Sequence, residues 1–173
     1  MAQPERQLLF GIDRRELIHA VRTTAAALVS LSIASLLRLP ESYWASITTL
    51  IVMQSTLGAA WTISKQRWAG TAMGAAVGAV LAAYANENVA AFGMGLFVLG
   101  VVCAALRVER SAYRYAGITL AIVMLVAHTE PAWMIALHRF IEISVGIAVG
   151  LVVTAIWPEA DSSQSLGPAP GSR

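Results

Sequence analysis

Long apolar stretches alternate with short polar breaks along most of the chain. A bilayer core about 30 Å thick needs about 20 helical residues, and somewhat fewer where the helix ends snorkel. The breaks contain proline, asparagine or clustered charges, which are typical of turns. The pattern predicts an all-α, polytopic membrane protein with six transmembrane helices near 17–37, 42–61, 68–84, 89–106, 112–127 and 137–157.

The segments outside this six-helix domain, 17–158, are short. Residues 1–16 are expected to form a cytoplasmic N-terminal segment, and the tail 159–173 is rich in Ser, Pro and Gly without apolar periodicity. Such a composition predicts disorder in the tail. The first apolar stretch is longer than that of a typical signal peptide and lacks a clean small-x-small cleavage site, so we expect it to be retained as a helix.

The composition narrows the class of protein. Apolar residues make up 57% of the chain and charged residues only 13%, and the mean hydropathy is +0.66. Both shares depart from those of soluble domains and indicate a protein whose main partner is the lipid bilayer. The net charge of +2 comes from arginines at segment ends, with no basic tract for nucleic acid.

The sequence contains none of the common motifs of soluble enzymes. There is no phosphate-binding GxxxxGK, no HExxH and no paired CxxC. The single Cys103 lies inside an apolar run, and His19, His128 and His138 are scattered. We therefore expect neither an enzyme nor a protein with a metal or another cofactor.

The distribution of lysine and arginine predicts the orientation. With the N-terminus inside, ten of these residues fall on the cytoplasmic side, whereas only Arg38 and Arg139 fall outside. Cytoplasmic loops carry the excess of Lys and Arg. Both termini are therefore expected to be cytoplasmic.

The chain contains an internal repeat. Residues 67–81, RWAGTAMGAAVGAVL, align with 139–153, RFIEISVGIAVGLVV, at an offset of seventy-two, and ASITTLIVM at 45–53 matches AGITLAIVM at 116–124 at seventy-one. Three crossings in each copy, about 17–84 and about 89–157, place the copies in opposite orientations. Such 3+3 inverted repeats are frequent in secondary transporters, although an old duplication that only builds a scaffold also fits.

Three charged residues follow from this repeat as candidates for function. Arg67 is expected to head the third helix at the cytoplasmic face, and its repeat mate Arg139 the sixth helix at the outer face, with one cation at each mouth. An arginine on the outer side departs from the rule that Lys and Arg lie mainly on the cytoplasmic side, so the position of Arg139 needs another explanation. Glu142, at i+3 from Arg139, forms either a local ion pair or a coupling group for protons or substrate.

Aromatic residues near helix entries supply a second set of candidates. Most of them, Tyr115 included, are typical of an interfacial belt. Trp44, with Thr48 one turn further, is the best candidate for substrate binding, since a planar anion pairs with arginine and stacks on a ring. In the first helix Arg22 shares a face with Arg15 and His19, where snorkelling and ligand contact are both open.

Glycines recur at every fourth residue in the two repeated helices. Such a stripe allows the backbone of another helix to approach closely, in this chain or in a second copy. The residues are Gly70, Gly74, Gly78, Gly146 and Gly150.

These motifs carry a family resemblance. Tyr43-Trp44-Ala45 at a helix entry, RWAGTAMG at 67–74, and the later set of Arg139, Glu142, Gly146 and Trp157-Pro158 resemble the fusaric acid resistance protein-like superfamily, which includes bacterial aromatic acid exporters. The plant aluminium-activated malate transporters look like distant relatives, with six-helix subunits that dimerise around an arginine-lined anion path.

The resemblance implies a multi-pass protein of the bacterial inner membrane, and it favours Arg67 and Arg139 as substrate contacts. Larger members add a sizeable cytoplasmic region, whereas this chain ends soon after the sixth predicted helix. A homodimer or a partner subunit is therefore expected. The leading hypothesis is a secondary exporter of organic anions, with aromatic carboxylic acids as substrates. An anion channel of the same architecture and a non-transporting scaffold are the alternatives.

Overall fold

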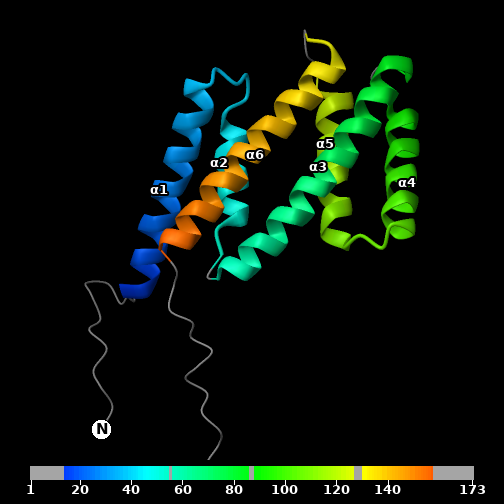
Figure 1. Ribbon diagram of the computed structural model, residues 1–173. Helices are drawn as coiled ribbons and strands as arrows, with labels where there is room; N and C mark the ends of the chain where they lie inside the picture. The colour runs from blue at the N-terminus through cyan, green and yellow to red at the C-terminus, as the bar shows by residue number, and fades with distance from the viewer. Residues whose placement is uncertain (1–13, 55, 86–87, 127–129, 158–173) are drawn as a thin grey trace, which may run out of the picture.

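The computed structural model describes residues 14–54, 56–85, 88–126 and 130–157, and every element in these ranges is helical (Figure 1). Most of the predicted N-terminal segment and the whole predicted tail lie outside the described residues. The helices are α1 (Arg14–Leu36), α2 (Tyr43–Val52), α3 (Leu57–Ala85), α4 (Val89–Ala105), α5 (Arg110–Leu125) and α6 (Ala132–Ile156).

Three of the described helices are long and apolar enough to cross a membrane: α1, α3 and α6, with 21, 29 and 25 residues in their candidate spans. The other three are shorter. α2 has 10 residues, α4 has 17 and α5 has 16. The predicted all-helical fold is confirmed, and three of its helices are suited to cross a membrane, whereas crossing by the three short helices stays a prediction.

The boundary between α2 and α3 differs from the predicted one. The charged sequence Lys65-Gln66-Arg67 suggested a break between helices, but α2 ends at Val52 and α3 begins at Leu57. The predicted start of the third helix, near 68, was wrong. The helix continues through the charges because Lys65 is exposed and Arg67 finds polar and aromatic partners in the interior.

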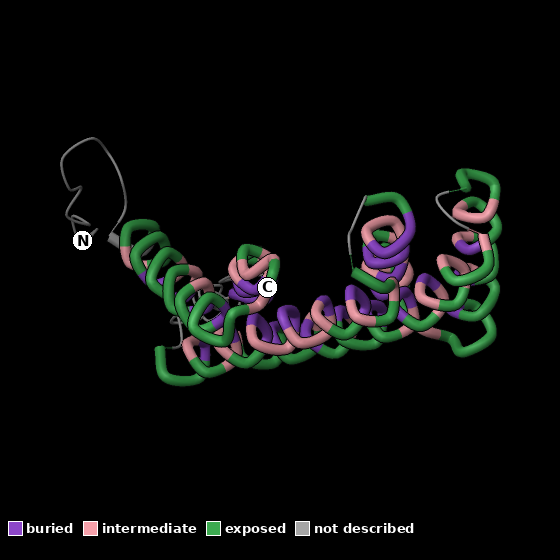
Figure 2. The backbone as a smooth tube through the Cα atoms, turned by 90° about the horizontal axis from the view of Figure 1, so that it is seen from above, coloured by how far each residue is buried: buried purple, intermediate pink, exposed green. Residues whose placement is uncertain are grey.

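α3 and α6 lie side by side at the centre and run in opposite directions (Figure 1). α5 packs on α3 and α4 on α5, while α2 packs on α6 and α1 on α2. Figure 2 shows α1 and α4 at opposite ends of an elongated layer. The start of α1 and the end of α6 lie at the same end of the molecule (Figure 1).

Glycines set the close approach of these helix pairs. A Cβ atom on Gly74 of α3 would collide with the backbone oxygen of Ala116 in α5, and one on Gly146 of α6 would collide with that of Ala45 in α2. Ala45 and Ala116 open the repeated nonapeptides of the sequence. The two halves of the chain therefore use matching residues for matching helix contacts.

The rest of the glycine stripe follows the same rule. A Cβ on Gly78 would press on Val123 at 3.1 Å, and one on Gly150 would press on Val52 at 2.9 Å. A Cβ on Gly70 would collide with the backbone oxygen of Ala112. All these contacts lie within one chain, which answers the question that the stripe left open.

Replacing Gly74 with alanine is expected to destabilise the protein by about 1–3 kcal/mol, because the added methyl group overpacks a helix contact made by rigid backbone. The matched control is Gly93→Ala in α4, where nothing lies within 4 Å of the new Cβ. There the change should be neutral or stabilising by up to about 1 kcal/mol, since alanine is the better helix former. Thermal unfolding midpoints in detergent measure both, and equal midpoints would contradict the packing argument.

Candidate functional site

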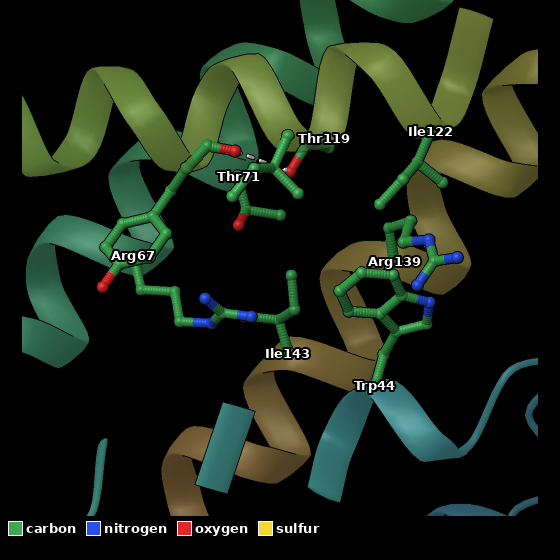
Figure 3. Close-up of a pocket in the computed structure, with 9 residues that line it drawn as sticks. Trp44, Arg67, Thr71, Thr119, Ile122, Arg139 and Ile143 are labelled. Atoms are coloured by element: carbon green, nitrogen blue, oxygen red, sulfur yellow. Dashed lines mark hydrogen bonds between the residues drawn. The ribbon is translucent and has the colours of Figure 1, made fainter. Parts of the chain in front are cut away.

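The two repeated arginines line one pocket at the centre of the molecule (Figure 3). Arg67 comes from α3 and Arg139 from α6, and their side chains are only 4% and 3% exposed. Arg67 lies ten residues after the start of α3, about 15 Å along the helix axis. The expectation that Arg67 heads the third helix was therefore wrong, because α3 begins about three turns earlier than the charges suggested.

Each arginine lies over the face of an aromatic ring. The Cζ atom of Arg67 is 4.9 Å from the centroid of the Tyr115 ring, and that of Arg139 is 4.4 Å from the centroid of Trp44. Such cation–π contacts help to stabilise a buried guanidinium group. Trp44 and Tyr115 are themselves seventy-one residues apart, the offset that aligns the two nonapeptides. Sequence reasoning left Tyr115 in the interfacial belt, although this offset identifies it.

Arg139 is fully engaged by two carboxylates. Its Nη1 lies 3.4 Å from Oε2 of Glu142, and its Nη2 forms an ion pair with Glu41. The other oxygen of Glu142 accepts a hydrogen bond from the backbone N–H of Glu41 at 3.0 Å. Glu142 therefore joins α6 to the loop before α2. Sequence reasoning missed Glu41, which looked like part of a turn beside Pro40.

The charge of Arg67 is not neutralised in this way by the described residues. Its Nε donates a hydrogen bond to Oγ1 of Thr48 at 3.2 Å. Across the described ranges, no carboxylate oxygen lies within 4.0 Å of its guanidinium nitrogens. A buried cation that is paired only with a hydroxyl and a ring leaves positive charge facing the pocket, and a bound anion would neutralise it.

Two more donors beside the pocket lack a partner among the described residues. Thr71 lies one turn after Arg67 on α3 and lines the pocket, and its Oγ1 is buried without a hydrogen bond. Nε1 of Trp44 is buried and unpaired as well. Buried polar groups are nearly always satisfied, so unpaired donors next to an unbalanced cation favour a missing acceptor.

The pocket is narrow in this conformation, with free space for about one water molecule. A ligand larger than water therefore requires the lining helices to move apart. Within the described ranges, no group of three or more His, Cys, Asp or Glu side chains is placed to hold a metal ion.

Arg22 lies elsewhere, although the sequence suggested it for substrate binding. Its side chain is completely buried, and it donates hydrogen bonds to the backbone oxygens of Trp157 at 2.6 Å and Gln54 at 3.1 Å. Those carbonyls follow the C-terminal ends of α6 and α2, where a cation complements the helix dipole. This contact ties α1 to two helix ends. His19 is exposed, and its ring nitrogen is 3.5 Å from Oγ1 of Thr23.

Comparison with known proteins places these features in a family. The chain is 29% identical over 157 residues to the uncharacterized transporter YdhK of Escherichia coli (strain K12) and 28% identical over 158 residues to that of Salmonella typhimurium. Each match covers 86% of this chain but only 23% of the relative, so the chain spans about a quarter of the length of these curated relatives. No solved structure matches. The model of the fusaric acid resistance protein-like family matches residues 26–153, and the chain belongs to that family.

Proposed function

We propose that this protein is a membrane transporter that exports organic anions, with aromatic carboxylic acids as the substrate class. The observation that carries the proposal is Arg67, a buried cation without a carboxylate partner in the described part of the chain. A substrate carboxylate can accept from its guanidinium group in the bidentate geometry that arginine favours. The unpaired hydroxyl of Thr71 supplies a further donor on the same helix.

The aromatic part of the substrate follows from the rings that flank the pocket. Tyr115 and Trp44 line it together with Ile143, a surface suited to a planar ring beside a charged group. The family description refers to resistance to fusaric acid, which is itself an aromatic carboxylic acid. The relatives are named as transporters, which supports the same class of function.

The mechanism we propose is alternating access between two inverted halves. The matching glycine contacts of α3 with α5 and of α6 with α2 support the inverted repeat. The narrow pocket is lined by residues of both halves, which suits the substrate site that such transporters form between their halves. No ATP-binding motif is present in the sequence, so the driving force is an ion gradient or the membrane potential. Two copies, or this chain with a partner subunit, form the working unit.

Transport is tested with the purified chain in proteoliposomes. An imposed proton gradient or membrane potential should drive the movement of labelled benzoate across the membrane faster than in protein-free vesicles. Unlabelled aromatic acids should compete with it. Absence of benzoate movement under every imposed gradient would sink the proposal. A scaffold would give that result while retaining its partner binding.

A channel is the second candidate, and the state of Glu142 favours it. Both oxygens of this carboxylate are engaged, by Arg139 and by the backbone N–H of Glu41, so Glu142 is less free to carry a coupling proton. Planar bilayer recordings separate the cases. A channel gives currents whose reversal potential follows the anion gradient alone, whereas a coupled exporter responds to the pH gradient as well.

The proposed topology has six crossings with both termini in the cytoplasm. Glu109 and Glu130 flank α5 and are exposed. Single cysteines at these positions, in a background where Cys103 is replaced by alanine, should react with an impermeant thiol reagent from opposite faces: position 130 in intact cells, and position 109 only after permeabilisation. Labelling of both from one face would show that the short α5 does not cross.

A further inference from the structure

The two halves of the pocket differ in charge, although their helix contacts match. Arg67 and Arg139 are repeat mates, yet only Arg139 has carboxylate partners among the described residues. By the offsets of the repeat, Glu142 corresponds to Gly70 and Glu41 to Ala112. On the side of the pocket where Arg67 lies, the two corresponding positions touch directly across α3 and α5, because a Cβ on Gly70 would collide with the backbone oxygen of Ala112. The repeat therefore has carboxylates at these two positions beside Arg139, and small residues without charge at the equivalent positions beside Arg67.

The two carboxylates occupy the groups of Arg139 that a substrate would use. A carboxylate binds arginine most strongly through two parallel hydrogen bonds to the guanidinium fork. In this structure Nη1 faces Glu142 and Nη2 faces Glu41. One cation with two carboxylates carries a formal charge of −1, which repels a further anion. The Trp44 ring covers the face of the same guanidinium group.

Glu41 is the more exposed of the two partners. It lies in the short connection between α1 and α2 and is 26% exposed. Glu142 is only 1% exposed, on the central helix α6. The loop carboxylate is therefore the partner of Arg139 that a substitution reaches with less disturbance of the core.

We infer that Glu41 is a specificity-determining residue that occupies Arg139 and so restricts the site to organic anions with a single carboxylate, which bind at Arg67. This inference rests on the proposed function. A dicarboxylate needs two cations, and the second one, Arg139, lines the same pocket but is already neutralised. Without the charge of Glu41, Arg139 becomes available for the second carboxylate of such a substrate.

The experiment measures how well benzoate and the three benzenedicarboxylate isomers compete with labelled benzoate for transport by the full chain in proteoliposomes at neutral pH. The wild type should prefer benzoate. Glu41→Gln should shift the preference toward at least one dicarboxylate by about tenfold. The matched control is Glu130→Gln, which removes an exposed carboxylate from the connection before α6 and should leave the preference unchanged.

A second variant and a binding measurement guard against misfolding. Glu142→Gln also removes one carboxylate from Arg139 and should shift the preference in the same direction, and calorimetric titration in detergent reports binding independently of transport. An unchanged preference in both folded variants overturns the inference, as does a wild type that takes dicarboxylates as well as benzoate. Those results leave the proposed function standing, whereas a wild type that neither binds nor moves benzoate refutes that function and this inference together.

Discussion

Replacing Arg67 with glutamine is expected to lower benzoate transport by about 10- to 100-fold. A hydrogen bond to a charged group contributes about 1.5–3 kcal/mol, and each 1.4 kcal/mol is a factor of ten, so losing one charged contact to the substrate has that effect. Arg67→Lys should recover part of the activity, because the charge remains while the bidentate fork is lost. Initial rates in proteoliposomes at equal protein content measure both variants.

The same substitution should not destabilise the protein, and this separates a binding role from a structural one. Burying Arg67 without a carboxylate partner among the described residues costs free energy. The thermal unfolding midpoint of Arg67→Gln should therefore equal or exceed that of the wild type, a common pattern at functional sites. Arg114→Gln, an exposed arginine on α5, is the control and should leave transport unchanged. A lower midpoint with a proportional loss of transport would make Arg67 a structural residue.

The internal repeat is what made much of the site predictable. Aligning the copies singled out Arg67 and Arg139 from the sequence alone, and the glycine stripe indicated where backbones approach. In the structure both arginines line one pocket. Arg67 lies over the ring of Tyr115 and Arg139 over the ring of Trp44, and these two aromatic residues are equivalent positions of the repeat. Repeated sequence predicts repeated contacts because equivalent residues meet equivalent neighbours.

The helix boundary and Glu41 were not predictable in the same way. A charged triplet at 65–67 is a reasonable break in a membrane sequence, since charges usually mark helix ends. The helix continues there because the distant Tyr115 and Thr48 stabilise Arg67, and such contacts depend on tertiary packing. Glu41 sits beside a proline in a turn. Its pairing with a residue almost one hundred positions away leaves no local trace in the sequence.

Replacing Arg139 with glutamine is expected to remove most of the folded protein, in contrast to Arg67. Breaking a buried ion pair by removing one partner costs about 3–5 kcal/mol, because the other charge stays buried and uncompensated. In this site two carboxylates, Glu41 and Glu142, lose their cation at once. Glu142→Gln alone should be mild, since the amide oxygen still accepts from the backbone N–H of Glu41 and Arg139 keeps one carboxylate.

The pair Arg139→Gln/Glu142→Gln should therefore restore most of the stability that the first change removes. A double-mutant cycle on unfolding midpoints and membrane abundance gives the coupling energy between the two residues. Additive effects would contradict the structural role of the ion pair. Transport by the paired variant then decides what Arg139 does for the substrate. If benzoate moves at the wild-type rate at normal abundance, Arg139 only neutralises its carboxylates, whereas a transport defect that persists at normal abundance would make Arg139 a direct contact of the substrate.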